Sequence, residues 1–263
     1  MLQYLKESTF RANDVFLRAI KLLKSHYISV AGLCFLLFVT NNLSSFLALY
    51  LTDSLPFSVR ILLLMVFIIL FFSLQLILIR RALNLVNHKE NMKVRSYIPT
   101  TKQFLSFILG LLTAIVISVT VACVVYVLCF PLLYLGVSMH TVLYEIHPLV
   151  TGLISLCVLL RTMFFPFFIL DKDFNVFKSY RFSLALTRGN FFRLFFVLLV
   201  VSFTFLLQLG AEYLEYSILA RVFSVINSFI IIPSVSLVLA VVYTDMMNEY
   251  KGEEDPELLK NII

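Results

Sequence analysis

The sequence contains no tryptophan and little charge. Only 14% of its 263 residues are Asp, Glu, Lys or Arg, whereas 61% are hydrophobic. Soluble domains are about a quarter charged, because a closed core still leaves a wet surface to cover. The shortage of charge therefore excludes a soluble globular fold and predicts a chain whose surface is covered largely by lipid.

Cysteine is also scarce, and its spacing indicates no redox or metal chemistry. The four cysteines lie inside apolar runs, without a Cys-x-x-Cys pair and without a histidine at ligand spacing: Cys34, Cys123, Cys129 and Cys157. Cysteines in such places are usually small buried hydrophobes rather than disulfides or metal ligands. We expect no metal and no cofactor.

Recognisable catalytic motifs are missing as well. The chain has no P-loop, no Gly-x-Ser-x-Gly, no His-Glu-x-x-His and no paired histidine and carboxylate. His140, Glu145 and His147 are close in sequence, and a metal site there is the less favoured alternative to a short polar loop. No Asp or Glu lies inside an apolar run, which argues against ion-coupled transport. The sequence thus favours a protein that is not an enzyme.

Six apolar runs are long enough to cross a bilayer, which takes about 20 residues as a helix. Backbone groups cannot stay unpaired in lipid, so such runs must be helical, and the lack of period-2 alternation argues against a barrel. The predicted fold is all-α, a polytopic bundle of six transmembrane helices near Tyr27–Leu51, Val59–Ile79, Phe104–Leu128, Leu149–Leu170, Phe191–Leu209 and Val222–Tyr243. Pro131 predicts a kink or a short re-entrant piece after the third run.

The basic residues predict how these helices are oriented. Eighteen of the 21 lysines and arginines fall on one side: before the first run, in the second and fourth connections, and after the sixth run. The opposite side carries only Arg60 and Arg221. This asymmetry places both termini in the cytoplasm. The net charge of +6 therefore indicates topology and anionic lipid headgroups, not nucleic acid.

A basic amphipathic helix is predicted between the fourth and fifth spans, over residues 173–189. Asp173 or Asn175 would cap its start, and Gly189 would end it. Its predicted apolar face consists of Val176, Phe177, Tyr180 and Leu184. The basic residues beside this face are Lys178, Arg181 and Arg188. Such a helix lies in the membrane interface with its cations near anionic headgroups or, as the simpler alternative, packs on its own bundle.

Residues 1–26 have the same design and are predicted to form a cytoplasmic interfacial segment. One face carries Phe16, Ile20 and Leu23, and another carries Arg11, Arg18 and Lys21. Residues 27–243 would then form the transmembrane domain, which includes the helix 173–189, and residues 244–263 an acidic cytoplasmic tail. An interfacial segment followed by a helical hairpin suggests a plan repeated over three hairpins.

Arg161 lies within the fourth predicted span, at a depth near the middle of the bilayer. A cation there costs on the order of 3 kcal/mol by insertion scales, so its side chain must meet protein, water or a lipid phosphate. Pro166 could free backbone carbonyls to receive it, and Asn41 and Asn42 are the predicted polar partners in the first span. A structural arginine is one interpretation, and a site for a substrate or an anionic lipid headgroup is the other.

The stretch from Arg161 to Leu199 reads RTMFFPFFILDKDFNVFKSYRFSLALTRGNFFRLFFVLL. It resembles the membrane domain of the bacterial glycerophosphoryl diester phosphodiesterase family and its uncharacterised stand-alone inner-membrane relatives. The positions that carry the resemblance are Arg161, Pro166, Asp171, Ser183, Leu186, Thr187, Arg188, Gly189 and Phe192. The resemblance implies a multi-span module of the bacterial cytoplasmic (inner) membrane. It implies no phosphodiesterase activity, because the catalytic domain is absent from this sequence.

These features predict a non-enzymatic integral inner-membrane module, a scaffold or accessory subunit of a membrane complex or a lipid-linked process. Its expected partners are membrane lipids, with anionic lipids favoured, and a membrane protein. The alternative is a transporter or lipid-handling protein that binds an anionic headgroup at Arg161, with Asn41 and Asn42 beside it.

Overall fold

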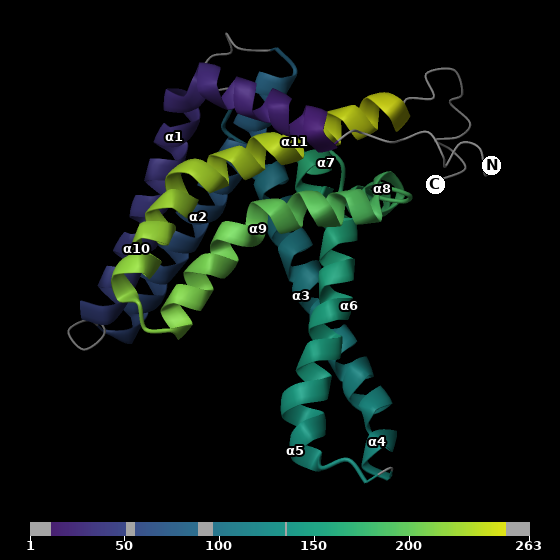
Figure 1. Ribbon diagram of the computed structural model, residues 1–263. Helices are drawn as coiled ribbons and strands as arrows, with labels where there is room; N and C mark the ends of the chain where they lie inside the picture. Colours follow the sequence, from purple (N-terminus) through teal and green to yellow (C-terminus); the bar gives the residue numbers. More distant parts are fainter. Residues whose placement is uncertain (1–11, 51–55, 89–96, 135, 251–263) are drawn as a thin grey trace. The chain divides into compact units, whose positions relative to one another are not determined.

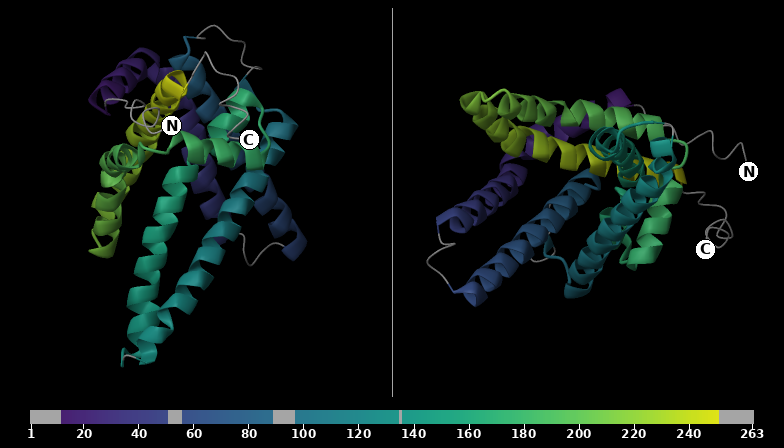
Figure 2. Two further views of the ribbon diagram at one scale, coloured as in Figure 1. Left: turned by 90° about the vertical axis from the view of Figure 1, so that its right-hand side faces the viewer. Right: turned by 90° about the horizontal axis from the view of Figure 1, so that it is seen from below.

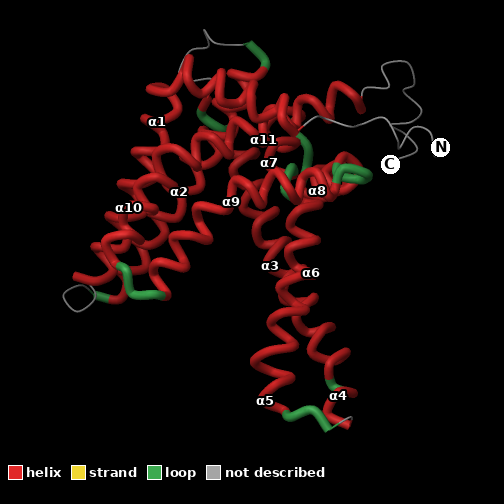
Figure 3. The backbone as a smooth tube through the Cα atoms, viewed as in Figure 1, coloured by secondary structure: helices red, strands yellow, loops and turns green. Residues whose placement is uncertain are grey.

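A computed structural model describes residues 12–50, 56–88, 97–134 and 136–250 (Figure 1). These residues form helices joined by short turns and include no strand (Figure 3). The helices are α1 Ala12–Tyr50, α2 Phe57–Val86, α3 Thr101–Cys129, α4 Pro131–Tyr134, α5 Met139–Thr141, η3 Val142–Ile146, α6 His147–Thr162, α7 Phe165–Lys172, α8 Val176–Leu186, α9 Phe191–Tyr213, α10 Ser217–Ile226, η4 Asn227–Ile231 and α11 Ile232–Tyr250. The elements η3 and η4 are π-helical turns.

Six helical stretches among the described residues are long and apolar enough to cross a membrane, which confirms the predicted all-α membrane fold. They span Asn13–Thr40, Phe57–Val86, Thr101–Tyr134, Met139–Lys172, Phe191–Tyr213 and Ser217–Asn248. Many of their large apolar side chains are exposed, for example Leu62 at 65% and Leu128 at 70%. Lipid is the solvent in which such exposure carries no penalty. The side of the membrane on which each end lies stays a prediction.

The chain divides into two compact units. Unit 1 comprises the described residues of Met1–Thr100 and Phe192–Ile263, and unit 2 comprises those of Thr101–Phe191. The second hairpin and helix α8 thus form a unit of their own, whereas the first and third hairpins share the other unit.

Unit 1 is built on α1, α2 and α11, which pack pairwise against one another. The buried side chains of α11 include Leu237, Val238, Val241 and Met246. In the middle of η4, the ring centroid of Phe229 lies 5.5 Å from that of Phe38. Its carbonyl accepts a hydrogen bond of 3.2 Å from the hydroxyl of Tyr27. These contacts tie the first and last spans of the chain together.

Helix α1 bends at His26, whose backbone angles (φ −125°, ψ 22°) are not helical. The bend falls at the predicted boundary between the interfacial segment and the first span, and Figure 1 shows the change of direction. In this segment Val15 and Ala19 are buried, whereas Ile20 of the predicted apolar face is 46% exposed. Helix α1 packs against α11, and the side chains that are buried in this segment are the smaller ones, which allow helices to approach closely.

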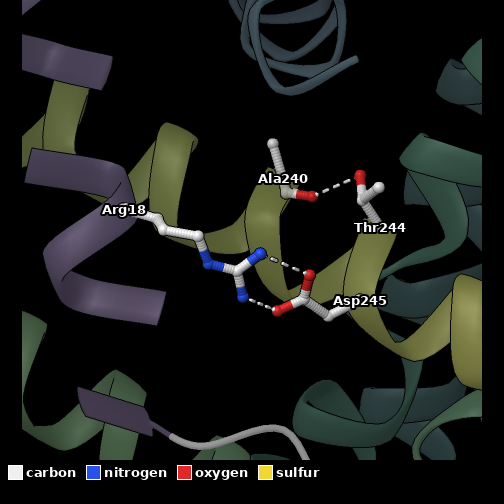
Figure 4. A network of polar contacts seen from close by, with 4 residues as sticks. All are labelled: Arg18, Ala240, Thr244 and Asp245. Carbon is white, nitrogen blue, oxygen red and sulfur yellow. Dashed lines mark hydrogen bonds and ion pairs between the residues drawn. The ribbon is translucent and has the colours of Figure 1, made fainter. Parts of the chain in front are cut away.

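The segment before the bend is joined to α11 by an ion pair. Both terminal nitrogens of the Arg18 guanidinium, Nη1 and Nη2, donate to the carboxylate of Asp245, and the bond from Nη1 measures 3.0 Å (Figure 4). The next residue to the N-terminal side, Thr244, donates to the Ala240 carbonyl one turn back at 2.9 Å. Asp245 opens the predicted acidic tail, but the tail begins within α11, which continues to Tyr250. Residues 251–263 lie outside the described residues.

Unit 2 is a hairpin of α3 and α6, which Figures 1 and 2 show side by side. At one end of the hairpin, α3 stops at Cys129 and the short helix α4 begins at Pro131. Proline has no N–H to donate within a helix, so the predicted interruption after the third span occurs there. A small core of Val125, Cys129 and Val142 closes this end. The helices α7 and α8 pack at the other end.

Candidate functional site at the break between α6 and α7

The fourth predicted span is not one continuous helix. Helix α6 ends at Thr162, Met163 and Phe164 form a turn, and α7 starts at Phe165 with Pro166 in its first turn. Pro166 cannot donate to a preceding carbonyl, and a break of this kind leaves N–H and C=O groups without helical partners. These groups need partners from elsewhere, and α8 supplies them.

Ser183 of α8 joins the two sides of the break with one hydroxyl group. Its Oγ accepts a hydrogen bond of 3.2 Å from the backbone N–H of Phe164 and donates one of 2.9 Å to the carbonyl of Arg161. The hydroxyl of Thr187, one turn later, has one hydrogen, which it shares between the same carbonyl at 3.3 Å and the Ser183 carbonyl of its own helix at 2.9 Å. Both residues are fully buried. Two hydroxyls of α8 therefore fix the end of α6 and the start of α7.

The side chain of Arg161 also reaches α8. Its Nη2 lies 3.5 Å from the carbonyl of Leu184, a long hydrogen bond, and its buried Nε has no partner among the described residues. The predicted partners lie in the other unit. Asn42 donates to the Phe38 carbonyl of its own helix at 2.8 Å, and the side chain of Asn41 lies outside the described residues. Pairing of Arg161 with these asparagines stays a prediction.

The buried face of α8 is held by aromatic packing. The ring of Tyr180 stacks on Phe165 with centroids 4.8 Å apart, and its hydroxyl donates to the carbonyl of Gly110 in α3 at 2.8 Å. Burial raises the pKa of Tyr180 to about 12, because the tyrosinate would lose its hydration. Phe182 packs against Phe168 and Phe174 on the same side. This face orients α8 against the hairpin.

The exposed face of α8 combines large apolar and basic side chains. Phe177 is 83% exposed and Leu184 is 42% exposed. The exposed basic residues are Lys178 and Arg181 of α8 and Arg188 of the turn that follows it. The predicted apolar stripe is therefore split: Val176 and Tyr180 are buried, whereas Phe177 and Leu184 face outward. The buried face instead uses Ser179, Ser183 and Thr187, because these small hydroxyl side chains bond to backbone groups and allow close packing.

Cations outnumber acids around this helix. The Nζ of Lys178 lies 4.4 Å from the ring centroid of Phe174, a cation–π contact. Asp171 pairs with Lys172 at 3.3 Å, and the carboxylate of Asp173 accepts from Gln103 of α3 at 2.8 Å. Both acids precede α8 and already have partners within unit 2. The exposed face of α8 itself carries no acidic residue.

The predicted helix ends are partly wrong. Asp173 does not cap α8, because it ends α7 in a left-handed conformation (φ 56°) with its side chain on Gln103. Asn175 occupies the position before the first turn, but its side chain makes no capping hydrogen bond. The helix ends at Leu186, and Gly189 follows in the turn with φ 89°. Glycine suits that turn because other residues seldom adopt positive φ.

The remaining predicted basic site residues belong to unit 1 or lie outside the described residues. Arg18 pairs with Asp245 in unit 1, Lys21 is exposed, and Arg11 lies outside the described residues. Near the α4 end of the hairpin, His147 contacts the carbonyl of Ala122 at 3.1 Å. Within the described parts of the chain, no three His, Cys, Asp or Glu side chains are grouped to hold a metal ion.

Sequence reasoning missed the roles of Ser183 and Thr187, although both were part of the family resemblance. Their signal was the spacing of hydroxyl residues at 179, 183 and 187, one turn apart on one helix face. In lipid-embedded packing, small hydroxyl residues mark close approach and backbone bonding. Reading that stripe as the packing face would have placed α8 correctly.

Comparison with known proteins leaves the chain without an assigned family. No family model matches it, and neither the curated proteins nor the solved structures include a match. The resemblance of the Arg161–Leu199 stretch to the phosphodiesterase membrane domain therefore stays a prediction, and function has to be argued from the geometry of the site alone.

Proposed function

We propose that the protein is a non-enzymatic membrane module that binds anionic lipid headgroups on the exposed face of α8. One observation carries the proposal: this face presents three basic residues around two outward-facing apolar side chains, Phe177 and Leu184, without an acid among them. A lipid surface satisfies both kinds of group, since the apolar side chains enter the acyl boundary and the cations meet phosphates.

The packing of α8 supports a fixed interfacial position. Its opposite face is bonded to the α6–α7 break through Ser183 and to α3 through Tyr180. A helix held in this way presents its basic face in one orientation, so little conformational entropy is lost on binding. Each basic residue near an anionic surface contributes about 1 kcal/mol.

Arg161 extends the same site inward. Its Nη2 makes only a long bond to Leu184 of α8, and its Nε is unpartnered among the described residues. A guanidinium in this condition can bind a phosphate with two parallel hydrogen bonds. Arg161 can therefore hold α8 through Leu184 and also bind a headgroup phosphate at the edge of α8, so the structural and the lipid-handling interpretations are compatible.

The absence of tryptophan from the sequence allows a direct test. Phe177→Trp places the sequence's single tryptophan on the exposed face of α8, where its fluorescence can be excited apart from that of the tyrosines. Bromine on a lipid acyl chain quenches the fluorescence of a nearby tryptophan. The protein is placed in bilayers that mix phosphatidylcholine with phosphatidylglycerol, and in separate samples one lipid or the other is brominated. We expect brominated phosphatidylglycerol to quench this tryptophan more strongly than brominated phosphatidylcholine at the same mole fraction.

Charge variants then assign the preference. In the Phe177→Trp background, Arg181→Gln with Arg188→Gln should weaken the preference for phosphatidylglycerol about 30-fold, from about 1 kcal/mol for each arginine. The matched control is Arg60→Gln with Arg221→Gln, which removes two exposed arginines predicted on the opposite side. Equal quenching by both brominated lipids in the protein that carries only Phe177→Trp would refute recognition of anionic lipid. Weak quenching by both lipids would mean that lipid does not reach this face, and would favour a protein partner on α8, the scaffold interpretation.

A further inference from the structure

Unit 1 contains a second polar cluster, within the last two predicted spans. Thr204, Gln208 and Glu212 lie one turn apart on one face of α9. Asn227, the first residue of the π-helical turn η4, faces them and is 2% exposed. Thr204 lies nine residues before the end of α9, which is roughly 14 Å along the helix axis. The cluster therefore runs from the end of the helix into the span.

Hydrogen bonds give this cluster a direction. The Nε2 of Gln208 donates to the carboxylate of Glu212 at 2.9 Å, and the Nδ2 of Asn227 donates to the Oε1 of Gln208 at 2.8 Å. A carboxylate only accepts, so Gln208 must turn its NH₂ group toward Glu212 and its oxygen toward Asn227. Asn227 must in turn use its NH₂ group. The charge of Glu212 therefore fixes the orientation of both amides.

The consequence is a buried acceptor deep in the span. The Oδ1 of Asn227 is buried and has no hydrogen-bond partner among the described residues, and the same holds for the Oγ1 of Thr204. The two residues are neighbours, since the Nδ2 of Asn227 lies 3.5 Å from the carbonyl of Thr204. Each unsatisfied buried oxygen costs about 1–3 kcal/mol. Unsatisfied buried groups call for an explanation, of which a bound ion is one, and π-helical turns are frequent at functional sites.

The behaviour of the other threonines makes Thr204 unusual. Threonine in a helix commonly donates to the carbonyl one turn back, and six described threonines do so: Thr40, Thr113, Thr120, Thr162, Thr187 and Thr244. Thr204 makes no such bond, a property that it shares with Thr151 of α6. Unlike Thr151, Thr204 contacts a residue that has a second unpartnered oxygen, since its backbone carbonyl lies 3.5 Å from the Nδ2 of Asn227.

We propose that Thr204 and Asn227 form a binding site for a small monovalent cation of the Na⁺ type. The amide donors of the cluster are already used, and the atoms left over are two oxygens, which hard cations prefer as ligands. The negative charge nearest along the chain of hydrogen bonds belongs to Glu212, which is exposed at the end of α9. Glu212 attracts a cation, and through Gln208 it also keeps the NH₂ group of Asn227 engaged, so that the oxygen of Asn227 is left free for the cation.

The test measures thermal unfolding of the purified full chain in detergent, with NaCl replaced by choline chloride at constant ionic strength. The proposal expects a saturable rise in the unfolding temperature with Na⁺ and none with choline. Thr204→Val keeps the shape of the side chain and the bonds of the two amides but removes one oxygen. It should raise the Na⁺ midpoint roughly tenfold, equivalent to about 1.4 kcal/mol of binding free energy.

Two further variants complete the experiment. Glu212→Gln changes an exposed residue, removes the charge that orients the amides and should weaken the Na⁺ response even if Thr204→Val does not fold. Thr120→Val is the matched control, because the Thr120 hydroxyl bonds only to its own helix at 2.8 Å. Identical melting of the wild type in NaCl and choline chloride would overturn the proposal, as would a Na⁺ response that both Thr204→Val and Glu212→Gln retain in full.

Discussion

Replacing Ser183 with alanine should destabilise unit 2 by about 2 kcal/mol. The substitution removes the acceptor of the Phe164 N–H and one of the two hydroxyl donors to the Arg161 carbonyl. The site is fully buried, so the orphaned N–H alone costs about 1–3 kcal/mol. The carbonyl keeps its bond from Thr187 at 3.3 Å, and alanine favours the helix by a few tenths of a kcal/mol, so we place the sum near the middle of that range.

Reversible unfolding in mixed micelles, followed by far-ultraviolet circular dichroism, measures this loss. A loss of about 2 kcal/mol corresponds to about a 30-fold change in the unfolding equilibrium. The matched control is Ser234→Ala in α11, whose hydroxyl bonds only to the Ile230 carbonyl of its own helix at 2.6 Å. The control should stay within about 0.5 kcal/mol of the wild type.

Thr187→Val sharpens the test, because Thr187 and Ser183 donate to the same carbonyl. Either single variant leaves that carbonyl one donor, and the double variant leaves it none. The double-mutant cycle should therefore show a coupling of about 1 kcal/mol, with the double variant less stable than additivity predicts. If Ser183→Ala unfolds like Ser234→Ala, or if the cycle is additive, α8 does not hold the break together and the reasoning fails.

Three other outcomes follow from the same packing. Gly110→Ala would place a Cβ 2.4 Å from Cε2 of Phe165, whose ring is stacked on Phe107 and Tyr180. Because this ring has little room to move, the overpacking should lower the free energy of unfolding by about 1–3 kcal/mol. The control Gly152→Ala, with open space around the added Cβ, should unfold like the wild type. The pKa of Tyr180 is raised from 10.0 to about 12, so the contribution of its neutral phenol to stability is fully present below pH 10 and is lost as the pH rises toward 12. A difference titration of tyrosinate absorbance between wild type and Tyr180→Phe should show one tyrosine that ionises near pH 12. Ionisation of that tyrosine near pH 10 would contradict its burial. A double-mutant cycle that replaces Arg18, Asp245 and both residues together should give a coupling free energy of only about 0.2–1 kcal/mol, because the Arg18 side chain is 53% exposed. This coupling should decrease as the salt concentration rises.

The position of α8 shows how far sequence periodicity reaches. The pattern of residues 173–189 predicts a helix, and α8 occupies Val176–Leu186 of that range. Ranking faces by apolar content found only part of the buried side, because Tyr180 is buried but Phe177 is exposed, and Ser183 is buried as well. In water the face with the large apolar residues is the buried one, but lipid accepts those side chains, so hydrogen bonding to backbone decides the packing instead.

The break at Met163 and Phe164 shows a different limit. Pro166 indicated that backbone carbonyls would be freed, and the carbonyl of Arg161 does bond outside its own helix. The donors are the hydroxyls of Ser183 and Thr187. A helix break is a local event that proline specifies, whereas the partner that satisfies it comes from a segment about 20 residues further along the chain.

The sequence by itself determined the all-α membrane class and the six apolar helices. Bilayer thickness and the need to pair every backbone group leave a long apolar run with one structure. Only the tertiary structure decided the division into two units, the ion pair of Arg18 with Asp245 and the polar chain from Glu212 to Asn227. These features depend on which helix faces pack against one another. Because lipid favours no apolar face over another, hydropathy does not predict which faces pack together.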